Sequence, residues 1–370
     1  MKITSRRQFC KFCVYLALTG FSPAVASLHT GCTAEDSSSP TPDGPDRGNK
    51  KFGRIHQSAR IDPEFEPAYL KLHRRGELSK RGEELWAVMQ SCELCPRMCG
   101  VNRIEGEKGF CEASFQLEIS AFNAHFGEEK PLVGKGGSGT IFLTHCGLRC
   151  VFCINWEISQ GDVGDRYRIE DMAAMMIELQ NNGCHNINFV TPTHYSPHIV
   201  LAVDRAAGQG LKLPLVYNTC GWERLEILRK LDGIIDIYLP DFKYTQGEMA
   251  AKYSSDAATY PEITQKALRE MHRQVGVAKP AKDGLMYKGL MIRHLVMPNN
   301  VSGTRQVIEW IAANLPSDTY LNIMSQYRPV YKAFDYPEIS RRITRAEFRQ
   351  AVQQAKQAGL TNLDIQGYWF

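Results

Sequence analysis

Short apolar, β-rich segments alternate with helical segments from about residue 139 to the C-terminus. Helical periodicity is clearest in Ile169–Leu179, Trp222–Leu231 and Val307–Leu315. The six predicted strands are Thr140–Thr144, Asn186–Val190, Leu213–Tyr217, Ile234–Leu239, Met291–Val296 and Thr319–Met324. Because parallel strands need long crossovers, this alternation predicts an α/β fold with a helix-covered parallel sheet. Such sheets carry their functional residues at the carboxyl ends of the strands.

The positive charge of the chain lies in its first 32 residues. The 370-residue sequence has 44 Lys plus Arg, 40 Asp plus Glu and a formal net charge of +4. Lys2, Arg6, Arg7 and Lys11 account for this excess, so the remaining residues are balanced in charge. Proteins that bind nucleic acid need a basic surface for the phosphates, and the balance therefore predicts no nucleic-acid partner. After the leader, no apolar stretch approaches the ~20 residues that span a bilayer.

The N-terminal leader has features of an export signal. Ser5–Lys11 reads Ser-Arg-Arg-Gln-Phe-Cys-Lys and resembles a twin-arginine motif. Ala24-Val25-Ala26 resembles a signal-peptidase site, whereas Thr30-Gly31-Cys32 resembles the end of a lipoprotein box. The leader therefore predicts export to the cell envelope or periplasm, with Cys32 as a candidate lipid anchor. The alternative is an uncleaved basic start on a cytoplasmic protein.

Composition divides the chain into four parts. Residues 33–52 are rich in Ser, Pro, Asp and Gly, which is typical of a solvated, disordered linker. The predicted parts are a signal peptide over 1–32, a linker over 33–52, an N-terminal extension over 53–138 and a core over 139–370.

Three cysteines follow the first predicted strand of the core. Cys146, Cys150 and Cys153 have the spacing C-x3-C-x2-C. Three thiolates can hold three irons of a [4Fe–4S] cluster and leave the fourth open to a cofactor. Radical S-adenosylmethionine (SAM) chemistry needs this arrangement, because one electron must reach the bound sulfonium to release a 5′-deoxyadenosyl radical. The alternatives are a zinc site completed by a residue such as His145, or a disulfide.

A second group of cysteines lies in the predicted extension, within residues 92–111. Cys92, Cys95, Cys99 and Cys111 have the spacing C-x2-C-x3-C-x11-C. Four thiolates this close together suit a structural Zn²⁺ or a second [4Fe–4S] cluster, and the spacing does not separate the two. Two disulfides are the alternative for an exported protein.

The sequence of the cysteine triplet resembles a known family. Cys146–Gln160, CGLRCVFCINWEISQ, resembles the radical SAM superfamily, and more closely an uncharacterised branch related to pyruvate formate-lyase activating enzymes. The likeness extends from Cys92 to about Leu363. The resemblance implies a partial (β/α)6 barrel with its cluster on the loop after strand one, preceded here by the four-cysteine extension.

The resemblance also implies roles for single residues. Cys146, Cys150 and Cys153 hold three irons, and Phe152 lies near the adenine of SAM. Asp241 and Lys243 match an Asp-x-Lys pair that contacts the cofactor, with Lys243 as a charge for a carboxylate and Asp241 as an acceptor.

Other strand ends carry further cofactor candidates. Thr191 and Thr193 stand where many members of the family have Gly-Gly-Glu for the amino group of SAM. Asn218, which ends the third predicted strand together with Thr219, is expected near the ribose or the methionyl carboxylate. Arg293 and Gln326 end or flank later strands and are weaker candidates.

The leading hypothesis is a radical SAM oxidoreductase that cleaves SAM reductively and abstracts hydrogen from a substrate. The resemblance implies glycyl-radical generation on a protein or peptide partner, and an electron donor such as flavodoxin or ferredoxin. The alternative is a non-catalytic iron–sulfur or zinc protein of the envelope, serving electron transfer or assembly. The export signal and the missing Gly-Gly-Glu favour that alternative, since SAM is made in the cytoplasm.

Overall fold

The computed structural model describes residues 65–161 and 163–366, which belong to one compact unit. The predicted signal peptide and linker, residues 1–32 and 33–52, lie outside the described residues, as do 53–64 of the predicted extension. Within the described ranges, no helix is long and apolar enough to cross a membrane.

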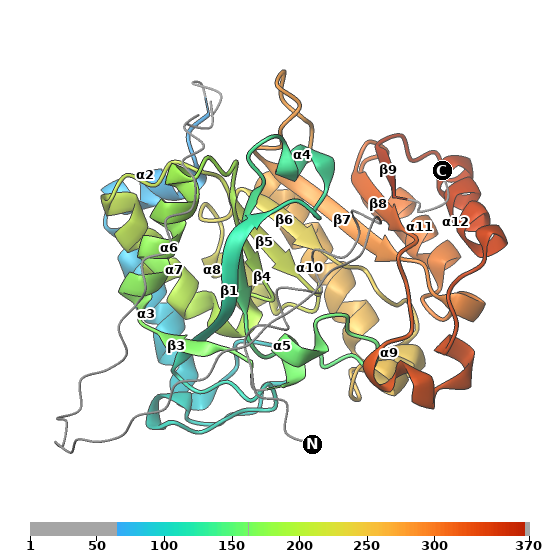
Figure 1. The fold of residues 1–370 in the computed structure, drawn as a ribbon, viewed down its shortest axis with the longest axis horizontal. Helices are drawn as coiled ribbons and strands as arrows, with labels where there is room; N and C mark the ends of the chain where they lie inside the picture. The colour runs from blue at the N-terminus through green and yellow to red at the C-terminus, as the bar shows by residue number, and fades with distance from the viewer. Residues whose placement is uncertain (1–64, 162, 367–370) are drawn as a thin grey trace, which may run out of the picture. The chain divides into compact units, whose positions relative to one another are not determined.

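One mixed sheet of nine strands forms the centre of the fold (Figure 1). Its strand order is β3-β1-β2-β4-β5-β6-β7-β8-β9. The strands are β1 (Leu117–His125), β2 (Ser138–Leu143), β3 (Asp165–Tyr167), β4 (Ile187–Val190), β5 (Leu215–Thr219), β6 (Ile237–Pro240), β7 (Gly289–Leu295), β8 (Tyr320–Met324) and β9 (Leu363–Gln366). From β2 to β9 all neighbours pair in parallel, whereas β1 pairs antiparallel with both β2 and β3. The six predicted strands are β2 and β4–β8, and their parallel arrangement is confirmed.

The limits of the predicted strands differ from the observed ones by a few residues. The third predicted strand begins at Leu213, but β5 begins at Leu215, after Pro214. Proline has no N–H to donate to a ladder, which explains the later start. The strand also extends beyond its predicted end, because the carbonyl of Thr219 accepts from the amide of Asp241 at 2.9 Å.

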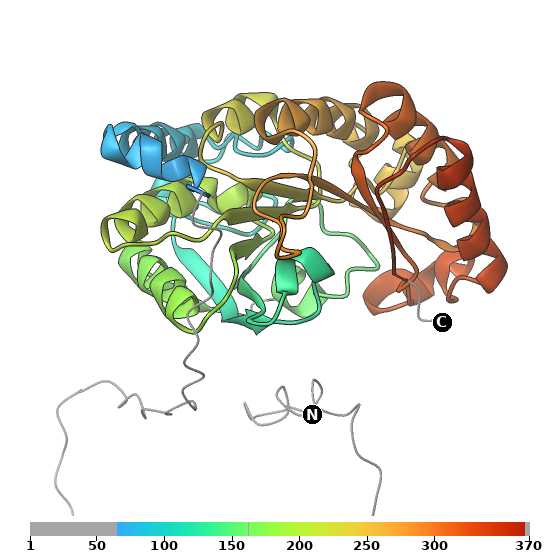
Figure 2. The same cartoon turned by 90° about the horizontal axis from the view of Figure 1, so that it is seen from above.

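The described residues form helices before β1 and in most connections between strands. They are α2 (Ala68–Arg74), α3 (Glu77–Ala87), α4 (Lys130–Val133), α5 (Trp156–Gln160), α6 (Ile169–Asn181), α7 (Ser196–Gly208), α8 (Leu225–Lys230), α9 (Gly247–Tyr253), α10 (Tyr260–Val275), α11 (Thr304–Asn314) and α12 (Arg345–Gln357). The three predicted helices are α6, α8 and α11, and α8 is the one that proves shorter than predicted. Figure 2 shows α10 and α4 on opposite sides of the sheet.

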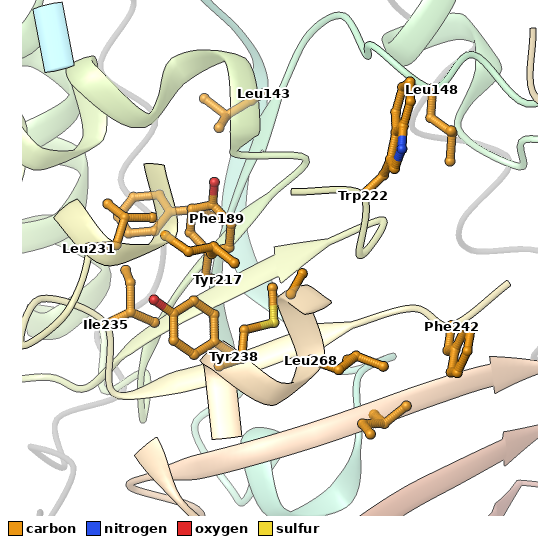
Figure 3. Packing of buried hydrophobic residues seen from close by; sticks show 14 of the residues in the cluster. Leu143, Leu148, Phe189, Tyr217, Trp222, Leu231, Ile235, Tyr238, Phe242 and Leu268 are labelled. Atoms are coloured by element: carbon orange, nitrogen blue, oxygen red, sulfur yellow. The ribbon is translucent and has the colours of Figure 1, made fainter. Parts of the chain in front are cut away.

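The main core lies between the sheet and the helices on its outer face. Phe189, Tyr217 and Tyr238 are fully buried there (Figure 3). The rings of Tyr217 and Tyr238 meet edge to face with centroids 5.8 Å apart. Aromatic side chains bury large apolar areas, so this layer contributes strongly to the stability of the sheet.

A smaller apolar cluster lies on the inner face of the sheet. It contains Leu132 from α4 and strand residues such as Val216, Leu239 and Met291. Side chains two residues apart on a strand share a face, so the next inward positions are polar. These inward residues are Asn218, Asp241, Arg293 and Asn322, two positions after Val216, Leu239, Met291 and Tyr320. The inner face is therefore apolar at one end and polar at the carboxyl end of the strands.

A side-chain contact joins the connection between β1 and β2 to β8, near the other edge of the sheet. Nδ2 of Asn322 in β8 donates to Oε1 of Glu129 at 2.8 Å. Glu129 directly precedes α4, in the connection between β1 and β2. The connection therefore reaches across the inner face to the far strands, which supports a partial-barrel shape.

Gly289 at the start of β7 provides a test of this packing. Its φ is +127°, and a Cβ there would lie 2.3 Å from Cα of Ala278. We expect Gly289→Ala to lower the free energy of unfolding by on the order of 3 kcal/mol, because strain and overpacking add. Gly210 has φ +93° with nothing within 4 Å, so Gly210→Ala should cost only about 1–2 kcal/mol. Urea unfolding measures the free energy of unfolding of both variants. Equal losses of stability would contradict the close approach of Gly289 to Ala278.

Candidate active site

The cysteine triplet occupies a tightly held loop after β2. The amide of Val151 donates to the carbonyl of Tyr253 at 2.9 Å, and Nε2 of Gln160 donates to the carbonyl of Cys150 at 2.9 Å. His145 and Arg149 have left-handed backbone conformations, with φ of +70° and +49°. Such conformations are uncommon for residues other than glycine and concentrate at functional sites. The loop is thus shaped by contacts to α5 and α9.

Each of the three sulfurs has one hydrogen-bonding neighbour. Oγ of Ser254 donates to Sγ of Cys150 at 3.1 Å, and Oγ of Ser159 lies 3.3 Å from Sγ of Cys153. The amide of Leu148 donates to Sγ of Cys146 at 3.4 Å. Donors of this kind stabilise thiolates and tune iron–sulfur clusters. The three side chains, all free thiols, therefore fit a [4Fe–4S] cluster with one iron left open.

The zinc alternative for the triplet required a fourth ligand such as His145. In the structure, Nε2 of His145 pairs with Oε2 of Glu118 in β1 at 3.0 Å. Within residues 65–161 and 163–366, no three His, Cys, Asp or Glu side chains are gathered closely enough to hold a single metal ion. The thiolates of a [4Fe–4S] cluster bind different irons and do not converge on one point.

A network of charged residues lies at the carboxyl ends of the strands, on the inner face. Oδ2 of Asp241 accepts from Nζ of Lys243 at 2.6 Å, and Oδ1 accepts from Nε of Arg293 at 2.9 Å. Arg293 also donates to Oδ1 of Asn218 at 2.6 Å and lies 3.6 Å from a carboxylate oxygen of Glu128. The side chains of Asp241, Lys243 and Arg293 keep 15–17% of their surface exposed, so a ligand can reach them.

The network keeps its charges despite burial. Burial raises the pKa of Asp241, but Arg293 and Lys243 outweigh it and hold the pKa below its usual range. Burial likewise lowers the pKa of Lys243, but Asp241 and Cys150 outweigh it and hold that pKa above its usual range. The pKa of Lys243 thus depends both on Asp241 at the strand end and on Cys150 in the cysteine loop.

Glu129 differs from the other acids of the network. Burial raises its pKa to about 7, Arg293 opposes the rise, and the nearby Glu128 adds to it. Its Oε2 is buried without a hydrogen-bond partner, while Oε1 accepts from Asn322. Glu129 is therefore partly protonated near neutral pH.

Asn218, Asp241 and Lys243 are the predicted cofactor residues that the structure brings together. Thr191, at the end of β4, has φ of +60° and donates its amide to the carbonyl of Asn218 at 2.9 Å. A β-branched residue in this conformation is strained, which marks the position as a candidate site. Phe152 packs into the core, with its ring 6.4 Å from that of Tyr244.

Thr193 belongs to a different group. Its hydroxyl donates to Oε1 of Glu223 at 2.5 Å, and the hydroxyl of Thr219 donates to the same oxygen. Burial raises the pKa of Glu223 to about 7. Because Glu223 joins Thr193, which follows β4, to Thr219, the last residue of β5, it fixes the two strand ends relative to each other. Gln326, a weaker candidate, has a buried Oε1 without a partner.

The cysteine quartet lies in a compact loop before β1. The amide of Cys92 donates to the carbonyl of Val101 at 2.9 Å, and the amide of Gly100 donates to the carbonyl of Cys92 at 3.1 Å. Burial raises the pKa of Cys95 to about 12, and the thiols of Cys111, Cys92 and Cys99 are among the groups that influence it. The four thiols are therefore electrostatic neighbours.

A buried arginine supports the quartet from inside. Arg103 is fully buried, and its guanidinium donates to the carbonyl oxygens of Ser114 at 2.6 Å and of His194 at 2.7 Å. It also points toward Sγ of Cys92 at 3.9 Å. Burial raises the pKa of the Cys111 thiol, and the positive charge of Arg103 opposes that rise.

The quartet and the triplet loop are in direct contact. Nε of Arg97 donates to the carbonyl of Gly147 at 2.9 Å, and its NH2 donates to the carbonyl of Ser254 at 3.3 Å. A Cβ on Gly147 would lie 3.4 Å from Sγ of Cys95. Gly147 directly follows Cys146, so the side chain of Cys95 lies beside the start of the triplet.

Sequence reasoning missed several residues of the site. No sequence motif predicted the contacts made by Arg97, Glu128, Glu129 and Ser254. The adjacent glutamates, which follow β1, were the one visible signal, because two neighbouring carboxylates repel each other and need partners. Ser254 lies 104 residues after Cys150 and gives no local signal.

A cavity of about 640 Å³ lies elsewhere, between α3, β1 and the N-terminal end of α6. Its lining includes Trp86, Phe115, Arg168 and His198, and none of the predicted site residues. This cavity is therefore separate from the predicted site.

Comparison with known proteins gives the following similarities. Residues 140–273 match the radical SAM superfamily. An uncharacterised protein of Methanocaldococcus jannaschii is 33% identical over 288 residues, 75% of this chain and 77% of the relative. A second uncharacterised protein of that organism is 24% identical over 265 residues, 66% of this chain and 73% of the relative. A solved radical SAM methyltransferase from Sphaerobacter thermophilus aligns with a TM-score of 0.43 and 11% identity, over 60% of this chain and 66% of that chain.

Glu129→Gln tests the raised pKa of this carboxyl. Below a pH of about 4.5, Glu129 is protonated in both the folded and the unfolded chain, so the substitution should change stability little. As the pH rises toward 7, Glu129 ionises in the unfolded chain but stays protonated in the folded chain. The free energy of unfolding of the parent therefore falls relative to that of the variant. The full difference above pH 7 is on the order of 3 kcal/mol. Thermal unfolding of both proteins across this range measures it, and a gap that stays constant with pH would contradict the raised pKa.

Proposed function

This chain belongs to the radical SAM superfamily, and we propose that it cleaves SAM reductively and abstracts a hydrogen atom from a substrate carbon. The observation that carries the proposal is the free-thiol triplet after β2, with a hydrogen-bonding group beside each sulfur. The charged network of Asp241, Lys243 and Arg293 at the neighbouring strand ends supports it.

Cys146, Cys150 and Cys153 would hold the [4Fe–4S] cluster. When bound, the cluster supplies the electron that splits SAM into methionine and a 5′-deoxyadenosyl radical. Burial raises the pKa of Cys150 to about 12, while Lys243 opposes that rise, so iron must displace a proton when it binds this thiol. Ser254 then donates to a thiolate that is buried and negatively charged.

The cofactor would lie between the cysteine loop and the strand ends. Lys243 supplies a positive charge for the methionyl carboxylate, and Asp241 supplies an acceptor while holding Lys243 in place. Asn218 is positioned by Arg293 to meet the ribose or the carboxylate. Phe152, before the third cysteine, would lie near the adenine. Thr191 and Thr193 stand where many members of the superfamily have Gly-Gly-Glu, and would meet the amino group of SAM through hydroxyl and backbone carbonyl oxygens instead.

The finer activity that we propose is that of an oxidoreductase resembling pyruvate formate-lyase activating enzymes. Its substrate would be a protein or peptide, on which it generates a radical, and its electrons would come from a flavodoxin or ferredoxin. The spacing of Cys146, Cys150 and Cys153 and the Asp-x-Lys pattern support this branch.

We also propose a second metal centre at Cys92, Cys95, Cys99 and Cys111, holding either zinc or a [4Fe–4S] cluster. Arg103 beside Cys92 supports a site of thiolates there. The twin-arginine-like leader supports export to the envelope, because that route carries folded proteins with their cofactors in place. Cys32 is the candidate lipid anchor of the exported form.

Replacing Cys150 by Ala tests the function directly. The parent, reconstituted anaerobically and reduced, should show a cluster signal in electron paramagnetic resonance that changes when SAM is added, and should form 5′-deoxyadenosine. Cys150→Ala should lose the SAM-dependent change and the product, because the cluster loses a ligand. Cys184 is buried and lies outside both cysteine groups, so Cys184→Ala is the matched control. A parent protein with a cluster but no response to SAM would instead support the alternative, a non-catalytic iron–sulfur or zinc protein of the envelope.

Lys243→Met separates cofactor binding from cluster binding. Loss of the positive charge should weaken SAM binding by about 10- to 100-fold, on the scale of one charge-assisted hydrogen bond. The cluster signal without SAM should persist. Lys252 lies at the surface beside Glu338, so Lys252→Met serves as a control that leaves binding unchanged. Titration of the signal with SAM measures both affinities, and equal affinities would remove Lys243 from the cofactor site.

A further inference from the structure

We propose that the cysteine quartet holds a second iron–sulfur cluster, which passes electrons to the cluster of the triplet. This inference rests on the proposed function, because it assigns the route by which the radical-forming cluster is reduced. Of the two alternatives for the quartet, zinc and an iron–sulfur cluster, it selects the cluster and assigns it a role in electron transfer.

The first support is the contact between the two groups. Sγ of Cys95 lies 3.4 Å from the position of a Cβ on Gly147, next to the first cysteine of the triplet. A cluster bound by Cys95 and one bound by Cys146 would thus be separated by a single layer of protein.

The second support is the orientation of the quartet between solvent and the triplet. Cys99 is exposed, whereas Cys92 and Cys111 are buried and Cys95 faces the triplet loop. Met98, beside Cys99, is 52% exposed. One end of the quartet is therefore open to an external partner, and the other end adjoins the second group of thiols. A relay needs these two faces, whereas a purely structural zinc site needs neither.

The third support is Arg97, which links the two groups. Its guanidinium donates to the carbonyls of Gly147 and Ser254, and the hydroxyl of Ser254 donates to Sγ of Cys150. The rings of Phe110 and Trp222 flank the guanidinium, with centroids 4.0 Å and 4.9 Å away. A cation held this firmly between two anionic clusters stabilises the added electron on either one.

The step is a one-electron transfer without a change in covalent bonds. A reduced flavin or iron–sulfur protein gives one electron to the quartet cluster and is itself oxidised by one electron. The quartet cluster then reduces the triplet cluster and returns to its oxidised state. No proton moves in either transfer, and the donor is renewed outside this protein.

The test begins with metal content and spectroscopy of the full-length protein, reconstituted anaerobically with iron and sulfide in the presence of zinc. Two [4Fe–4S] clusters correspond to about eight irons per chain. We expect that content, no bound zinc, and two interacting paramagnetic signals after reduction. About four irons together with one zinc would overturn the proposal.

Cys99→Ala then tests the relay. Cys99 is exposed, so its loss should leave the folded core intact. Reduction of the triplet cluster by reduced flavodoxin should slow by at least tenfold, while dithionite, a small reductant, should still reduce it. An unchanged rate with flavodoxin would overturn the relay even if the quartet holds iron. Cys184→Ala is again the control.

The same samples separate this inference from the proposed function. In Cys99→Ala reduced with dithionite, the signal of the triplet cluster should still change on addition of SAM. If the parent shows no such change, the proposed function fails whatever the quartet contains. Arg97→Gln should lower the reduction potentials of both clusters, and Arg97→Lys should restore them in part because it keeps the charge. Potentials that do not move in Arg97→Gln would exclude Arg97 from the relay.

Discussion

The carboxylate of Asp241 organises the charge inside the sheet. Its two oxygens accept from Arg293 and Lys243, so one buried acid is paired with two cations. Arg293 in turn fixes Asn218, whereas Lys243 interacts electrostatically with Cys150. An uncompensated buried charge is costly, and these side chains are therefore stable only as a set. The connection between the strand ends and the cysteine loop depends on this one acid.

Ser254 has a comparable position between the two cysteine groups. Its hydroxyl contacts the sulfur of Cys150, and its carbonyl accepts from Arg97 of the quartet loop. Both contacts come from a residue that directly follows α9, a short helix on the far part of the chain. The cysteine loops are thus held by the body of the fold and not by their own sequence alone. This explains why a short motif with two left-handed residues can keep one shape.

The sequence predicts the parallel sheet and the positions of its polar strand ends, because alternation of strands and helices is a local signal. The resemblance to the activating enzymes also implies that Asp241 and Lys243 act together, because they match the Asp-x-Lys pattern of that family. The closure of the inner face was not predictable, because Glu129 and Asn322 are 193 residues apart and neither belongs to a pattern. Likewise, the hydroxyl of Thr193 is engaged by Glu223, a contact across 30 residues that only the folded chain reveals. What sequence reasoning misses is the pairing of side chains across long separations.

The contact between Cys95 and Gly147 has a consequence for biogenesis. The ribosome makes the quartet first, but the carbonyls that receive Arg97 belong to residues 50 and 157 positions later in the chain. Four thiols therefore emerge well before the surface that will cover them exists. During this interval they are open to oxidation and to the wrong metal. For the proposed second metal centre, this order of synthesis would place metal loading before the docking of the two loops.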